Sequence, residues 1–385
     1  MKKIVIAASY FGINLGDEAI LEAIIKSIYH IRKDIKITVL AWDVKKVREF
    51  HYDLFKKFNI KVLCQPGGKF QIKELFNYFL LLRAFLSIAL CNYFIWGGGG
   101  IINDEGYFLK YYLTSLKIAS LLKKKIFVFA IGVNFIKNKK LSRKIKKYLS
   151  KAHLISVRDE KSMENLNNMG VKKEINVVAD PVFFLENCNP GQFYKKETSQ
   201  FIVGVNLRPW FDRIIHSTDE VLKMDKTLDN LANIFLELKK ELNFQLILIP
   251  FDLLKDVKIL KILKDKLGSA LNVELCDKIN SLDELKNIMQ KLDFFIGMRL
   301  HSIIFALRGK IPFFLISYTE KTNNLIKLLN LRDNFISIEK LADISDLNYL
   351  VKKIKYFFCN QEVAMFKDNN KNNSEMLIRN FLIDN

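Results

Sequence analysis

The sequence predicts an α/β protein built from two parallel-sheet domains that face one another across a cleft. The first observation is size, because 385 residues with 50% hydrophobic content can bury more than one core. The second is pattern: apolar runs of strand length alternate with amphipathic helical stretches, which is typical of a parallel α/β sheet. The third is a polar, turn-rich interruption at 186–199, which we interpret as the linker between the domains.

Strands and helices are expected to alternate from the N-terminus through the first half. The opening MKKIVIAASY has an apolar run too short for a signal peptide and leads directly into a glycine-containing turn, so it predicts the first strand. The predicted strands are 3–8, 36–41, 93–96, 126–130, 154–157 and 176–178. The predicted helices are 17–32, 44–58, 72–90, 107–122, 141–151 and 161–168. Together they form a predicted N-terminal domain over 1–190.

The second half repeats this alternation. Its predicted strands are 202–207, 245–249, 273–275, 293–296, 312–316 and 335–337. Its predicted helices are 228–242, 255–267, 282–292, 302–307 and 321–328. These elements predict a C-terminal domain over 200–350. Two further helical stretches, at 347–357 and 375–383, predict a tail over 351–385 that packs across the domain interface.

Cysteine usage and charge narrow the class. The five cysteines are scattered without metal-ligand spacing, which favours a reducing cytoplasm and predicts neither a disulfide framework nor a metal site. The net charge of +20 favours anionic partners, although lysine is spread over most polar helix faces. The one dense basic segment is 137–151, KNKKLSRKIKKYLSK, with apolar residues at helical spacing. It fits a solvated helix face, with docking on an anionic membrane as the alternative; without aromatic stacking residues, nucleic acid is not expected.

The most apolar segment is 79–96. A membrane-spanning helix needs about 20 apolar residues with few or no charges, whereas Arg83 and Asn92 interrupt this segment and four glycines end it. We therefore expect a buried helix over 72–90, followed by a strand. A helix that grazes a membrane surface is the alternative.

The candidate active site lies in DFFIGMRLHSIIFALRGKIPFFLISYTEK, residues 293–321. Arg299 and His301 follow one predicted strand, and Lys321 follows the next. Ligands of open parallel sheets bind outside the carboxyl ends of strands, so two cations and an imidazole are expected in one cleft. This set suits acid–base chemistry on an anionic substrate. The alternative is that Arg299 caps a neighbouring helix and His301 is a core histidine.

Two more arginines follow predicted strand ends. Arg158 comes after Ser156-Val157, and Arg208 comes after Asn206-Leu207. Arginine has the side-chain shape best suited to carboxylate and phosphate. Either arginine alone fits a surface ion pair. Together with Arg299 and Lys321, they predict an anion-binding pocket.

Glycine-containing turns offer a second set of candidates. In SYFGINLGDEAI, Asn14 and Asp17 stand where a strand turns into a helix, so they could contact a sugar or phosphate, or form a purely structural turn. Four glycines, including Gly98 and Gly99, follow the predicted strand 93–96 and precede Asp104. Such a run loses backbone entropy on folding, which indicates a close approach to the backbone. We expect an acceptor-binding loop here; a flexible turn is the alternative.

Several segments, in this order, resemble the polysaccharide pyruvyl transferase family. The matching segments are FGINLGDEAIL (11–21), WGGGGIINDEG (96–106), SVRDEKS (156–162), VVADPVFFL (177–185), VGVNLR (203–208), GMRLHSIIFAL (297–307) and PFFLISYTEKT (312–322). The resemblance implies a GT-B-like fold with two Rossmann-like domains. It also implies transfer of a pyruvyl group from phosphoenolpyruvate to two sugar hydroxyls, as a ketal, without any cofactor. The N-terminal domain would then hold the acceptor, and the C-terminal domain would hold phosphoenolpyruvate.

The resemblance also implies roles for individual residues. His301 would be the general acid–base, and Arg158 and Lys321, with Arg299, would hold the phosphate and carboxylate of phosphoenolpyruvate. Arg208 is a further candidate for this set. The segment AIGVNFIKN (130–138) departs from the family pattern because it lacks a proline and upstream glycines.

The implied partners are phosphoenolpyruvate and a saccharide acceptor, either a cell-surface glycan or its lipid-linked precursor. Two alternatives stay open at this point. One is a GT-B-type glycosyltransferase that uses a nucleotide sugar, and the other is a non-catalytic protein that binds a membrane surface.

Overall fold

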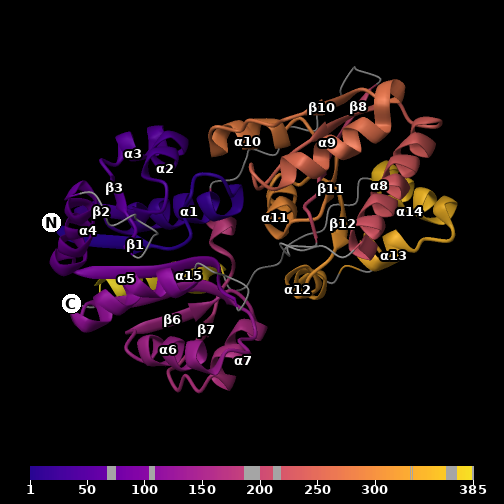
Figure 1. Ribbon diagram of the computed structural model, residues 1–385. Helices are drawn as coiled ribbons and strands as arrows, with labels where there is room; N and C mark the ends of the chain where they lie inside the picture. The colour runs from indigo at the N-terminus through magenta and orange to yellow at the C-terminus, as the bar shows by residue number, and fades with distance from the viewer. Residues whose placement is uncertain are drawn as a thin grey trace. The chain divides into compact units, whose positions relative to one another are not determined.

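The computed structural model describes residues 1–66, 75–103, 109–185, 200–210, 218–329, 331, 333–360 and 371–383. Within these ranges it describes only the backbone of residues 75–78, 110, 184, 218, 320, 321, 328, 371–375 and 383. The chain forms two compact units (Figure 1). One comprises Met1–Leu185 together with the C-terminal helix α15, Lys371–Ile383; the other comprises the described residues from 200 to 360.

The first unit is built on a seven-stranded sheet in the order β3-β2-β1-β4-β5-β6-β7, in which every recorded pair of strands is parallel. Its strands are β1 Lys2–Ala7, β2 Ile35–Ala41, β3 Lys61–Cys64, β4 Tyr93–Ile102, β5 Lys125–Val133, β6 Leu154–Val157 and β7 Asn176–Val177. Both faces of the central strands are covered, which is why β4 and β5 are almost wholly apolar.

Helices connect these strands. They are α1 Leu15–Ile31, α2 Val44–Phe50, α3 Tyr52–Lys57, α4 Leu75–Leu90, α5 Leu109–Leu121, α6 Lys139–Leu149 and α7 Glu160–Asn168, with a short helix η1 at Pro181–Phe184. The helix predicted at 44–58 is two helices, because the chain breaks at His51. The buried imidazole of His51 lies 2.9 Å from the Glu18 carboxylate, and this contact directs it inward.

The second unit has a six-stranded parallel sheet in the order β10-β9-β8-β11-β12-β13. The strands are β8 Phe201–Asn206, β9 Phe244–Leu248, β10 Val273–Leu275, β11 Phe294–Gly297, β12 Phe313–Ser317 and β13 Phe335–Ser337. The helices are α8 Thr218–Lys239, α9 Asp256–Leu267, α10 Leu282–Met289, α11 Leu300–Arg308, α12 Glu320–Leu328, α13 Ile338–Ala342 and α14 Leu347–Asn360, with a short helix η2 at Gly268–Ala270. Leu228, Phe235 and Ile354 from the helices pack on Val205 and Phe294 in the core.

The sequence prediction of two parallel α/β units is therefore confirmed. The strand order reverses between β1 and β4 in the first sheet and between β8 and β11 in the second. Ligands of open α/β sheets bind at the carboxyl ends of strands beside such a reversal. Each unit thus has one edge where a site is expected.

Three sequence expectations differ from the structure. The glycines expected in a loop after 93–96 belong to strand β4, whose pairing with β5 shifts register between Gly99 and Ile102. The expected tail is divided, because α14 packs on α8 and β12 whereas α15 packs on α1. Finally, α4 is not a buried helix: Ala84 and Ile88 are buried, but the opposite face is exposed. No helix in the described part of the chain is long and apolar enough to cross a membrane.

Candidate active site

The carboxyl edge of the second sheet carries most of the predicted catalytic residues. Arg208 follows β8, Arg299 and His301 follow β11, and Tyr318 follows β12, three strands that are adjacent in the sheet. Lys321 lies in the first turn of α12, and its side chain is outside the described residues. The prediction that the chain gathers cations and an imidazole at one sheet edge therefore has a structural basis within this unit.

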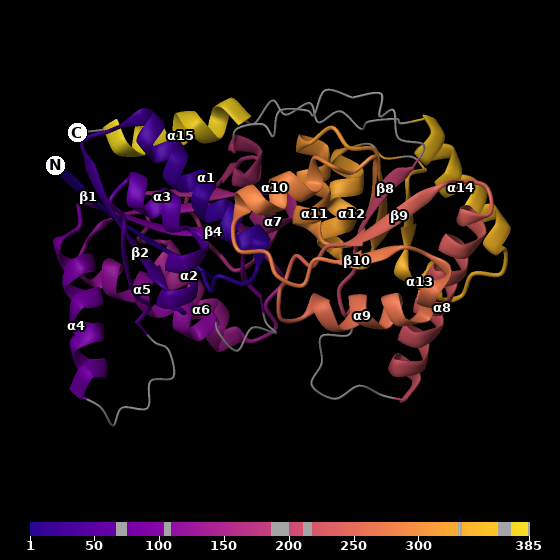
Figure 2. The same cartoon turned by 90° about the horizontal axis from the view of Figure 1, so that it is seen from above.

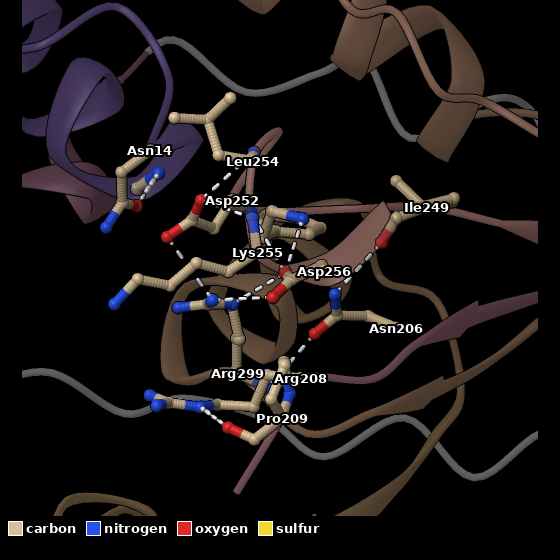
Figure 3. A network of polar contacts seen from close by, with 12 residues as sticks. Asn14, Asn206, Arg208, Pro209, Ile249, Asp252, Leu254, Lys255, Asp256 and Arg299 are labelled. Atoms are coloured by element: carbon tan, nitrogen blue, oxygen red, sulfur yellow. Dashed lines mark hydrogen bonds and ion pairs between the residues drawn. The ribbon is translucent and has the colours of Figure 1, made fainter. Parts of the chain in front are cut away.

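Arg299 forms ion pairs with two carboxylates, those of Asp256 and Asp252. Its Nε and Nη2 atoms donate to Oδ2 and Oδ1 of Asp256, each at 2.6 Å, and Nη2 lies 3.5 Å from Oδ2 of Asp252 (Figure 3). Asp256 is fully buried and also accepts from the backbone N–H groups of Phe251 and Asp252. Burial by itself would lower the pKa of Arg299, but the two carboxylates raise it above its ordinary value. Arg299 is therefore a positive charge that the protein already balances.

Asn206 links this ion pair to the neighbouring strands. Its Oδ1 atom accepts from the backbone N–H of Arg299 at 3.1 Å, and its Nδ2 atom donates to the carbonyl of Ile249 at 2.9 Å. The ends of β8, β9 and β11 are thereby fixed to one another (Figure 3). Because Arg299 is the N-cap residue of α11, the same contacts fix where that helix begins.

His301 lies in the first turn of α11, two residues after Arg299. Its side chain is partly exposed, and its Nε2 atom is buried. The following Ser302 is fully buried and donates its hydroxyl to the carbonyl of Arg299 at 2.7 Å. The backbone that carries the imidazole is thus held on both sides, which suits a group that must transfer protons at a defined position.

Arg208 packs against an aromatic side chain, that of Tyr318. Its Nη1 atom donates to the Tyr318 hydroxyl at 3.0 Å, and its Cζ atom lies 4.9 Å from the centroid of that ring. Its Nε atom donates to the carbonyl of Pro209 at 3.0 Å. These contacts hold the guanidinium beside the Tyr318 ring, where β8 ends.

Arg158 lies at the carboxyl edge of the first sheet. Only 5% of its side chain is exposed, and its Nη1 atom donates to Asp180 at 3.4 Å. The guanidinium packs on Gly132, where an added Cβ would come within 2.8 Å of its Nε atom. Its role as a ligand for phosphoenolpyruvate stays a prediction, and within the described residues it serves as a buried ion-pair partner.

The candidates for acceptor binding also lie in the first unit. Asn14 is the N-cap of α1, and its side chain accepts from the backbone N–H of Gly16 at 3.1 Å. Asp17 lies in the first turn of α1, and its Oδ1 would be 2.9 Å from a Cβ added at Gly99. At Gly98 an added Cβ would meet Ile20 of α1 at 2.2 Å. The close approach that the glycines indicated is thus made by α1. Asp104 lies outside the described residues.

Sequence reasoning missed the acidic residues that organise both edges. Glu18 is fully buried, and its Oε1 atom accepts from the backbone N–H groups of Phe11 and Gly12. In the second unit, Asp252 and Asp256 likewise accept from backbone N–H groups of the segment that follows β9. The available signal was an acidic residue at the start of a predicted helix, close behind a strand.

In the described part of the chain, no group of three or more His, Cys, Asp or Glu side chains could hold a metal ion.

Comparison with known proteins gives one family and one fold. The family model described as "Polysaccharide pyruvyl transferase" matches residues 14–320. No curated protein matches the chain in sequence.

Solved structures match along the whole chain. The UDP-GlcNAc 2-epimerase from Methanocaldococcus jannaschii is similar with a TM-score of 0.61, 14% identity and full coverage of both chains. The S. aureus MnaA-UDP co-structure has a TM-score of 0.60 at 12% identity, covering 100% of this chain and 97% of that one. MurG from Acinetobacter baumannii has a TM-score of 0.51 at 13% identity, covering 98% and 99%. These likenesses confirm a GT-B-like fold.

Proposed function

Since this chain belongs to the polysaccharide pyruvyl transferase family, we propose that it moves a pyruvyl group from phosphoenolpyruvate onto two hydroxyls of one saccharide. The products are a cyclic ketal and inorganic phosphate. The observation that carries the proposal is the position of His301, which lies at the carboxyl edge of the second sheet, in the first turn of α11. The family match includes this segment.

The reaction needs one proton donor and two attacking hydroxyls. His301 gives a proton to the methylene carbon of phosphoenolpyruvate, which becomes a methyl group and leaves C2 electrophilic. One sugar hydroxyl bonds to C2, and its proton passes to the imidazole of His301. The C2–O bond to phosphate then breaks, with the electron pair leaving on phosphate. The second hydroxyl bonds to C2 to close the ketal, and its proton goes to the departing phosphate. Histidine suits both proton transfers because it exchanges protons near pH 7.

The donor is a small, highly charged anion, and it requires cations at its phosphate and its carboxylate. We assign this role to Arg208, Lys321 and Arg158, with Arg299 as a further candidate. Arg208 follows β8 and lies beside Tyr318, which follows β12, so it belongs to the same sheet edge as His301. A donor that binds there would also lie close to Tyr318.

The acceptor is proposed to be a cell-surface glycan or its lipid-linked precursor, modified on the cytoplasmic side, where phosphoenolpyruvate is made. Asn14, Asp17 and Asp104 are proposed to contact it, whereas Gly98 and Gly99 would act indirectly, by letting α1 pack closely on β4. Asn14 and Asp17 lie in the first turns around the start of α1, next to the strand-order reversal of the first sheet.

A donor competition tests the proposal. The purified protein is incubated with a mixture of short glycans and either phosphoenolpyruvate or UDP-sugars, and the products are identified by mass spectrometry. We expect phosphate release that depends on both phosphoenolpyruvate and glycan, together with a glycan product that carries a pyruvyl ketal. Release of UDP with glycosylation of the acceptor would overturn the proposal in favour of a nucleotide-sugar glycosyltransferase.

A further inference from the structure

The outward face of α4 is apolar. Over residues 79–90 the exposed side chains are hydrophobic apart from Arg83: they are Phe79, Leu82, Phe85, Leu86 and Leu90. Phe79 is 54% exposed and Leu90 is 62% exposed. A surface helix of a globular protein normally presents polar residues to water instead. Contiguous exposed apolar surface of this kind marks an interaction site.

Helices α5 and α6 of the first unit lie on the same face of the sheet as α4. The crossovers from β3 to β4, from β4 to β5 and from β5 to β6 all run in the same direction across the sheet, so right-handed connections place α4, α5 and α6 on one face. The contacts of α5 with both α4 and α6 agree with this (Figure 2). Leu121, at the end of α5, is 62% exposed and extends the apolar surface.

The outer face of α6 is strongly basic. It exposes Lys139, Lys140, Arg143, Lys144 and Lys147, and no carboxylate in the described part of the chain forms an ion pair with any of these five. The first turn of α6 contains no acidic residue. Phe135 is 64% exposed and lies three residues before Asn138, the N-cap of α6. One helix layer therefore presents hydrophobic side chains on α4 and uncompensated positive charge on α6.

We propose that this α4–α6 layer docks on the surface of an anionic lipid bilayer. The lysines and the arginine of α6 would contact lipid headgroups, while Phe135 and the exposed side chains of α4 would enter the interfacial region. Clustered positive charge beside exposed apolar side chains is the combination that such a surface recognises. A second copy of this chain is a poorer occupant, because pairing two such layers would place the charges of α6 against either the like charges of α6 or the apolar side chains of α4.

Vesicle flotation tests the proposal without any substrate, so its outcome is independent of the proposed chemistry. The full chain is floated with vesicles of equal parts phosphatidylglycerol and phosphatidylcholine, and with vesicles of phosphatidylcholine alone. We expect binding to the anionic vesicles only, weakening as salt is added. The basic variant Lys140→Gln/Lys144→Gln/Lys147→Gln should reduce the partition coefficient by about tenfold or more.

A matched variant controls for total charge. Lys258→Gln/Lys261→Gln/Lys264→Gln removes three exposed lysines from α9 in the other unit, and it should change binding by less than about twofold. A third variant, Leu82→Gln/Leu86→Gln/Leu90→Gln, should also weaken binding by about tenfold, because apolar side chains then no longer enter the interface.

Four outcomes would overturn the proposal. They are equal binding to both kinds of vesicle, an equal loss in the α9 variant, no binding to either vesicle, and concentration-dependent dimerisation that the α4 variant abolishes. The last would assign the surface to a second copy of the chain.

Discussion

The bidentate contact between Arg299 and Asp256 limits what either residue can do for a substrate. Both oxygens of a fully buried carboxylate are occupied by one guanidinium, and Asp252 lies 3.5 Å from the same group. Removing one partner of a buried ion pair leaves an uncompensated charge, which is far more costly than losing an exposed pair. At the scale of single residues, Arg299 should therefore matter for folding as much as for binding.

We predict that Arg299→Leu lowers the free energy of unfolding by about 3–5 kcal/mol, because the Asp256 carboxylate would stay buried without its partner. Urea denaturation followed by circular dichroism measures the change. Arg143→Leu is the matched control, since it removes the same side chain from the exposed face of α6, and it should change the free energy of unfolding by less than about 0.5 kcal/mol. In the proposed reaction, Arg208→Leu should raise the KM for phosphoenolpyruvate. Unchanged stability with a raised KM in Arg299→Leu would make Arg299 a donor ligand.

His301 gives the second prediction at this scale. His301→Gln keeps a polar side chain of similar length but cannot exchange a proton near pH 7, so kcat for phosphate release should fall by about 10²–10⁴-fold. The melting temperature should stay the same as that of the wild type. The control is His30→Gln, on the exposed surface of α1, which should leave kcat unchanged. Near-normal phosphate release by His301→Gln would remove this imidazole from the mechanism.

The sequence could identify these candidates but not their surroundings. A histidine and arginines at predicted strand ends are visible from local pattern, because strand ends and helix starts are short-range features. The carboxylates that bind Arg299 lie more than 40 residues earlier, at a separation of 43 for Asp256. Only the sheet order brings β9 and β11 to either side of β8, so the partner of Arg299 could not be predicted from spacing.

At the scale of elements, strand β4 shows how a closely packed helix restricts which residues a strand can contain. Gly97, Gly98 and Gly99 have φ values of 138°, 87° and 89°, which other residues rarely adopt. Gly98 also faces Ile20 of α1 with no room for a side chain. The glycines therefore let α1 approach the sheet at its strand-order reversal.

We predict that Gly98→Ala destabilises the protein by about 2–5 kcal/mol, through strain at positive φ and overlap with Ile20. Thermal unfolding measures the loss. Gly268→Ala is the control: Gly268 has φ 54° but nothing within 4 Å of an added Cβ, so only the backbone strain of about 1–3 kcal/mol should appear. If Gly98→Ala kept its stability and lost only affinity for the acceptor, the glycine would serve substrate binding rather than packing.

The sequence predicted helices and strands correctly where neighbouring residues determine their bounds. It failed where a contact between residues far apart in the sequence determines where a helix ends. The strands at 154–157 and 273–275 have the bounds expected from sequence, although each contains one polar residue, Ser156 or Glu274. Strand β3, Lys61–Cys64, was missed. The break at His51 accompanies its contact with Glu18, 33 residues away in sequence. The spacing of apolar residues along the helix cannot predict such a contact.

At the scale of the whole molecule, the chain closes its first unit with its last helix. After the second unit is complete, α15 returns to pack on α1 and beside η1. The carbonyl of Leu382 accepts from Nη1 of Arg32 and from the Tyr93 hydroxyl, at 3.1 and 3.2 Å. The first unit therefore cannot be complete until the C-terminal residues have been synthesised, although its seven strands come first in the sequence.

This dependence predicts a mutation that acts on one unit only. Phe381 is 4% exposed and packs between Tyr93 and Phe127, with ring centroids 5.3 and 5.0 Å away. Phe381→Ala should cost about 3–5 kcal/mol, because it leaves a cavity against β4 and β5. Hydrogen exchange followed by mass spectrometry should show lost protection in these strands and unchanged protection in β8 and β11.

The control for this prediction is Met376→Ala on the same helix, where the side chain is 51% exposed and its loss should change little. Equal loss of protection in both sheets after Phe381→Ala would mean that the two units unfold as one cooperative body. Unchanged protection everywhere would mean that α15 adds nothing to the first unit. The expected result, loss confined to one sheet, would show that the two sheets fold independently although the first needs residues from both ends of the chain.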